Sequence, residues 1–148
     1  MSESSKNDFY QKMRKEIRSW LQSKAGEGYK WSEYLLLAPD LFHLLAKLAI
    51  AKELPAKEKA KVAAALGYFV SPIDFVPEAM FGPVGYLDDV AIAAYAINAI
   101  AKNGYEDLIQ EQWAGEVDVL EKVRQVVDLG ADMLGNKLWD KLKKIVGS

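Results

Sequence analysis

Cysteine is absent from the 148 residues, and histidine occurs once, as His43. The first absence excludes disulfides, thiolate metal sites and thiol nucleophiles. With a single imidazole, a zinc site of the usual kind is excluded, and a Ser-His-Asp triad could be built only on His43. No motif surrounds His43, so we interpret it as a structural residue of a helix. Any metal would have to be a hard cation with oxygen ligands, such as Mg²⁺ or Ca²⁺.

Long hydrophobic runs are also missing. The longest charge-free runs, 62–73 and 90–101, have 12 residues each, whereas a membrane-spanning helix needs about 18 or more. The N-terminal stretch MSESSKNDF contains no apolar core of the kind that a secretory signal carries. We therefore expect a cytoplasmic protein, which could still lie at the periphery of a membrane.

What the sequence does contain is helical periodicity, without the alternation of strands and without internal repeats. Hydrophobic residues make up 51% of the chain, enough for the core of one domain over residues 1–148. The spacing and the Pro and Gly positions predict helices over 6–24, 32–37, 40–53, 55–70, 87–102 and 105–113, followed by 116–146 with a break at Gly135. The predicted fold is all-α, a compact bundle of about six helices around a central apolar helical hairpin.

Charge is distributed unevenly along the chain. Residues 1–73 carry a net charge of +4, residues 74–121 carry −9, and residues 122–148 carry +3. The acidic middle argues against nucleic-acid binding, which needs a basic face to neutralise phosphates. Two interpretations stay open: complementarity between helices of the same chain, or an acidic surface for a basic partner.

The connection inside the central hairpin carries the most distinctive pattern. It reads YFVSPIDFVPE over 68–78 and GYLDD over 85–89. This closely resembles the YkvA-like family, small helical domains of unknown function, and the resemblance covers about residues 44–100. Glu78 replaces the usual aspartate, and the spacer with Gly82-Pro83 is about one residue longer. The resemblance implies a helical domain that is often suspected of membrane association, with no established activity or cofactor. The segments 6–24 and 105–146 are then additions to that core.

Four carboxylates, Asp74, Glu78, Asp88 and Asp89, are the only charges between residues 62 and 101. Burying an unpaired charge is expensive, so their presence needs an explanation. The favoured one is helix capping. Ser71 is an N-cap candidate with Pro72 at the first helical position and Asp74 at the third, and Asp88 and Asp89 lie in the first turn of the next helix.

A functional interpretation of the same residues stays open. If the two helix starts converge, Asp74, Asp88 and Asp89 could share a Mg²⁺ or Ca²⁺ ion, or a carboxylate pair could do acid/base work. The candidate cluster, functional or capping, is Ser71, Asp74, Glu78, Tyr86, Asp88 and Asp89. We also expect the hydroxyls of Tyr68, Tyr86 and Tyr95 to hydrogen-bond to buried acids or carbonyls.

The C-terminal segment 137–146 is basic and amphipathic. Lys137, Trp139, Lys141 and Lys144 are its candidate contacts with an anionic membrane or a partner. The alternative is a terminal packing helix whose lysines suit the negative end of the helix dipole.

Taken as a whole, the sequence favours a non-enzymatic helical interaction module that acts through protein–protein or membrane-surface contact. No catalytic residue is assigned and no cofactor is expected. One alternative is a divalent-cation-binding hydrolase that uses Asp74, Glu78, Asp88 and Asp89. Another is an inhibitor or immunity-type protein whose acidic 74–121 region binds a basic partner.

Overall fold

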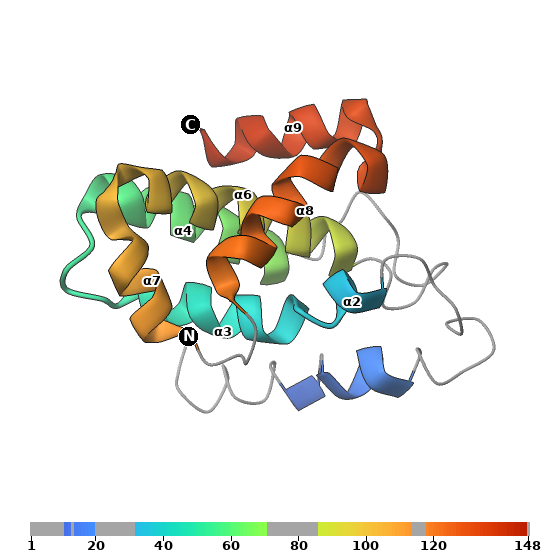
Figure 1. The fold of residues 1–148 in the computed structure, drawn as a ribbon, viewed down its shortest axis with the longest axis horizontal. Coiled ribbons are helices and arrows are strands. Elements are labelled where there is room, and N and C mark those ends of the chain that lie inside the picture. The colour runs from blue at the N-terminus through green and yellow to red at the C-terminus, as the bar shows by residue number, and fades with distance from the viewer. Residues whose placement is uncertain (1–10, 13, 20–31, 71–85, 114–117, 148) are drawn as a thin grey trace.

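The computed structural model describes residues 11–12, 14–19, 32–70, 86–113 and 118–147, which form helices and short turns without a strand. Figure 1 shows the helices α2 (Ser32–Leu35), α3 (Ala38–Ala49), α4 (Ala56–Val70), α6 (Tyr86–Ile100), α7 (Glu106–Gln112), α8 (Val119–Leu134) and α9 (Asn136–Val146). A π-helical turn, η2 (Ala101–Tyr105), joins α6 to α7. Residues 11–12 and 14–19 are also helical. The prediction of an all-α fold is confirmed.

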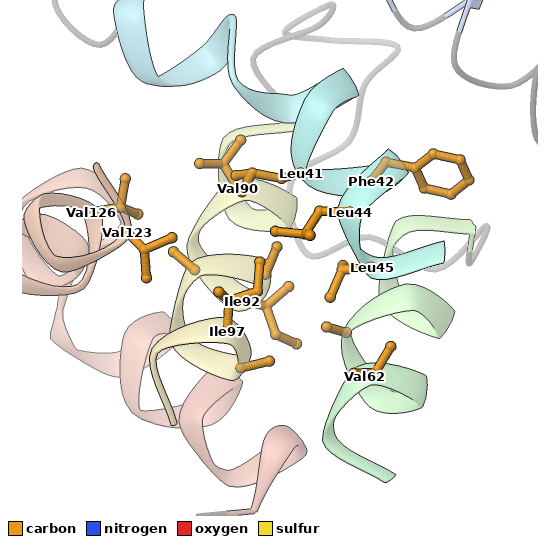
Figure 2. Close-up of a cluster of buried hydrophobic side chains, with 14 of the residues drawn as sticks. Leu41, Phe42, Leu44, Leu45, Val62, Val90, Ile92, Ile97, Val123 and Val126 are labelled. Carbon is orange, nitrogen blue, oxygen red and sulfur yellow. The ribbon is translucent and has the colours of Figure 1, made fainter. Parts of the chain in front are cut away.

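The central element of the bundle is α6, which contacts α2, α3, α4, α8 and α9. Figure 2 shows Ile92 and Ile97 of α6 between side chains of α3 and α4 on one side and Val123 and Val126 of α8 on the other. A helix buried over most of its circumference must be largely apolar, which explains the charge-free run at 90–101; only Tyr95, Asn98 and Ala99 are partly exposed in it. No helix in the described ranges combines the length and hydropathy that a bilayer crossing requires.

By comparison, α4 is less enclosed than its sequence suggests. The apolar run at 62–70 predicts burial on every side, yet Ala63 and Gly67 are exposed while Val62, Ala65 and Tyr68 are buried. The helix packs against α3, α6 and α9, and its remaining face carries small residues. The prediction is wrong for that face, because small residues lose little when they meet water and so hide the boundary of a buried surface.

The helix α3 ends four residues before its predicted end at Glu53. Ile50, which lies inside the predicted helix 40–53, is 69% exposed at the C-cap. Its backbone N–H donates to the carbonyl of Lys47 at 3.3 Å, which tightens the last turn and ends the helix. Leu54, 3% exposed, provides the buried contact of the turn instead.

The predicted glycine breaks are confirmed at two places. Gly104 has φ 99° in the turn after α6, and Gly135 has φ 87° between α8 and α9. Residues with a β-carbon rarely adopt this conformation. The helix α8 begins at Val119 rather than near Glu116, because Asp118 is its N-cap: Asp118 Oδ1 accepts from the N–H of Leu120 at 3.1 Å and of Glu121 at 3.3 Å.

Candidate functional site

The described part of the predicted carboxylate cluster is the first turn of α6. The side chains of Asp88 and Asp89 are described there, and Tyr86 is described through its backbone as the first residue of the helix. Ser71, Asp74 and Glu78 lie outside the described residues. The site can therefore be built from the α6 side only.

Asp88 is fully buried and joins two helices. The hydroxyl of Tyr68, in the last turn of α4, donates a hydrogen bond to Asp88 Oδ2 at 2.7 Å. The backbone N–H of Asp89 donates to Asp88 Oδ1 at 3.1 Å. The expected tyrosine partner and the expected backbone donor are both confirmed. Hydrogen bonds to a carboxylate are stronger than those between neutral groups, so the bond from Tyr68 holds the end of α4 against the start of α6.

Asp89 is 1% exposed and lies beside Asp88 in the same turn. The positive end of the helix dipole favours carboxylates at this position. Neither side chain offers an appreciable oxygen surface to solvent. A general acid or base must come within hydrogen-bond reach of its substrate, and this arrangement gives a substrate no direct approach to either carboxylate.

A metal site needs more ligands than these two residues. Within the described ranges, no group of three or more His, Asp and Glu side chains is placed to hold a metal ion. His43 is half-buried on α3 and takes part in no such group. Asp74, the third residue of the predicted Mg²⁺ or Ca²⁺ site, lies outside the described residues. A shared ion on Asp74, Asp88 and Asp89 therefore stays a prediction.

A second buried polar cluster lies at the start of α4. The sequence pattern places Glu58 and Lys61 on solvated first turns, but they are 3% and 7% exposed, so that prediction is wrong. Lys61 Nζ lies 3.2 Å from Glu58 Oε2, and Asn103 Nδ2 donates to Glu58 Oε1 at 2.8 Å. Asn103 belongs to η2, 45 residues further along the chain. The i, i+3 charge pair was a visible signal, but its burial depends on this distant contact.

The helix α9 turns its tryptophan inward. Trp139 is 6% exposed, and its ring meets Tyr95 of α6 edge-on, with centroids 5.8 Å apart. Gly130 of α8 approaches the same ring so closely that a β-carbon there would lie 2.5 Å from Trp139 Cε2. Trp139 is therefore a packing residue in this structure, which corrects its predicted role as a surface contact.

The other predicted contacts of α9, Lys137, Lys141 and Lys144, are exposed. They occupy positions i, i+4 and i+7, so they form one stripe along the outer face of the helix. The half-buried Lys143 is placed differently: its Nζ lies 3.5 Å from Asp140 Oδ1 and 5.6 Å from the centroid of the Trp139 ring. We call Lys137, Lys141 and Lys144 the lysine stripe.

Comparison with known proteins identifies the central part of this structure. Residues 58–95 match the model of a family described as "Protein of unknown function (DUF1232)", and this range contains both signature stretches, 68–78 and 85–89. The chain is also 34% identical over 121 residues to "Uncharacterized protein ORF9" of Methanothermobacter thermautotrophicus, a similarity that covers 79% of this chain and 78% of that protein. No solved structure matches the chain significantly. The chain therefore belongs to the DUF1232 family, usually called YkvA-like, as its sequence resemblance predicts.

Proposed function

We propose that this protein is a non-enzymatic helical interaction module that acts through contact with a protein partner or a membrane surface. The observation that carries the proposal is the burial of Asp88 and Asp89, at 0% and 1% exposure. Carboxylates that work on a substrate must reach it, whereas Asp88 is engaged between α4 and α6 by Tyr68. The burial favours a structural role for these acids. We therefore infer that the function depends on residues at the protein surface.

The exposed charges of two helices support this proposal, because those of α7 are all acidic and those of α9 are basic except for Asp140. On α7, Glu106, Asp107 and Glu111 are exposed, and they form part of the acidic 74–121 region. On α9, the exposed residues include the lysine stripe. Figure 1 shows α9 along the upper edge of the bundle and α7 at the lower left, well apart. Surfaces of one sign favour encounter with partners of the opposite sign and disfavour others.

Metal dependence separates this proposal from the hydrolase alternative. We expect the melting temperature of the full chain to be the same with EDTA, Mg²⁺ or Ca²⁺. An ion that bound the folded state at a concentration 100 times its Kd would stabilise it by roughly 2.7 kcal/mol, which is several degrees for a chain of this size. A rise of that size, lost in Asp88→Asn and Asp89→Asn variants that still fold, would contradict the proposal.

The interaction itself can be followed in the host cell. A tagged chain, expressed at its native level, is expected to run in a complex larger than its own 16.5 kDa or to sediment with membranes. Because charged surfaces are screened by salt, high salt should release it. A chain that is a free monomer in every fraction at low salt would contradict an interaction module.

A further inference from the structure

From the structure we infer that the lysine stripe of α9 is a docking surface for an anionic lipid bilayer, on which the helix lies flat without inserting. This inference rests on the proposed function and names the partner of one surface. The evidence is the contrast between the two faces of α9: the inner face packs in the core, and the outer face is basic and exposed.

The inner face of α9 is committed to the fold. Trp139, Leu142 and Val146 are 6%, 0% and 7% exposed. The Trp139 ring rests on Gly130 and against Tyr95, and α9 contacts α4, α6 and α8. An amphipathic helix that inserts into a bilayer must turn its apolar face toward the acyl chains. Here that face is occupied, so α9 can bind a membrane only through its outer face.

The outer face is positive. The lysine stripe spans seven positions, about 10 Å along the axis, and all three side chains are exposed. Asp140 is the one acidic residue on this helix, and it lies within 3.5 Å of Lys143. Ile145, 41% exposed, flanks the stripe. Basic residues with an adjacent aliphatic side chain suit the headgroup region of an anionic membrane.

The shape and placement of this face favour a flat anionic surface over a segment of another protein. Beside the end of the stripe lies an open depression lined by Tyr95, Asp140, Lys143, Lys144 and Gly147, and such an open surface would not enclose a peptide. The acidic α7 lies well away from α9 (Figure 1). When the stripe faces the bilayer, the carboxylates of α7 lie away from the negative membrane surface. Salt screens the field of that surface, so its repulsion of these carboxylates is weak.

The expected binding is electrostatic and reversible. Each lysine near an anionic surface strengthens partitioning roughly fivefold. The three stripe lysines together therefore account for an effect on the order of 100-fold. Because a screened field provides this effect, binding should fall steeply as salt rises, and neutral vesicles should retain little protein.

Vesicle sedimentation with the full chain tests the inference. The vesicles are phosphatidylcholine alone, or phosphatidylcholine with about 30% phosphatidylglycerol, in low and high salt. The triple variant Lys137→Gln, Lys141→Gln, Lys144→Gln should lose binding to the anionic vesicles by on the order of 100-fold. The matched control is Lys15→Gln, Lys52→Gln, Lys102→Gln, which removes the same charge from exposed lysines elsewhere and should bind within about threefold of the wild type. Circular dichroism checks that both variants fold.

The inference would be overturned by no binding of the wild type to anionic vesicles at low salt, by equal losses in the two triple variants, or by equal binding to neutral vesicles. Sedimentation of the chain without lipid tests a second copy as the occupant of the stripe. Self-association that the stripe variant abolishes, without vesicle binding, also overturns the lipid inference. In that case, as with a soluble complex from the host cell, the interaction module stands and only its lipid partner is lost.

Discussion

Replacing Trp139 by alanine is expected to lower the free energy of unfolding by about 3–5 kcal/mol, the usual result of deleting a buried large aromatic side chain. Trp139 is 6% exposed and fills the space between α8, α9 and Tyr95 of α6. Its removal leaves a cavity beside Gly130, which has no side chain to fill it. Urea unfolding followed by circular dichroism measures the change.

Gly130→Ala provides a control for this prediction, because its effect on the free energy of unfolding should have opposite signs in the wild type and in the Trp139→Ala variant. Alanine in a helix interior is normally about 1 kcal/mol better than glycine. At position 130, however, the new β-carbon would lie 2.5 Å from the Trp139 ring, and overpacking of this kind costs about 1–3 kcal/mol. Gly130→Ala should therefore destabilise the wild type but stabilise the Trp139→Ala variant. A Gly130→Ala substitution that stabilises both backgrounds would show that α9 does not rest on α8 in this way.

Replacing Tyr68 by phenylalanine should lower the free energy of unfolding by about 1.5–3 kcal/mol, the range for a hydrogen bond to a charged group. The ring and its packing are kept, but Asp88 Oδ2 loses the donor that lies 2.7 Å away. Because Asp88 is fully buried, water cannot replace the lost donor without opening the contact between α4 and α6. Urea unfolding again gives the value.

The matched control for Tyr68→Phe is Tyr95→Phe, which also removes one tyrosine hydroxyl. Tyr95 is half-buried, and its ring contact with Trp139 remains in the variant. We expect a change within about 0.5 kcal/mol, as for most substitutions away from buried polar contacts. Equal losses in the two variants would mean that Tyr68 stabilises the fold through its ring alone.

The sequence predicts the helices well wherever a local signal fixes them. Gly104 and Gly135 mark the turn after α6 and the end of α8, because only a residue without a β-carbon adopts their positive φ freely. The charge-free run at 90–101 identifies the central helix, because a helix buried over most of its circumference has little place for a charge. The bond between a buried acid and Tyr68 also follows, because an isolated carboxylate in an apolar run requires donors.

The sequence fails where burial depends on a distant contact. In the sequence, Glu58 and Lys61 have the pattern of ordinary surface charges. In the structure, Asn103 of η2 donates a hydrogen bond to Glu58. Trp139 on a lysine-rich helix looks like a membrane anchor, since its partners Gly130 and Tyr95 lie on two other helices. Gly130 itself looks merely tolerated, because nothing in its local sequence indicates that an aromatic ring will lie against its backbone. Such contacts are tertiary, and local periodicity carries no information about them.

The most direct test of a structural role for the buried acids is the free energy of unfolding of Asp88→Asn. In the wild type, both oxygens of Asp88 accept hydrogen bonds, from Tyr68 and from the N–H of Asp89. The amide can supply only one oxygen, so its NH₂ group would face a donor. We predict a loss of about 1–3 kcal/mol. A carboxylate kept for function usually lowers stability, and its replacement often raises it. An Asp88→Asn variant as stable as the wild type, or more stable, would contradict the structural role.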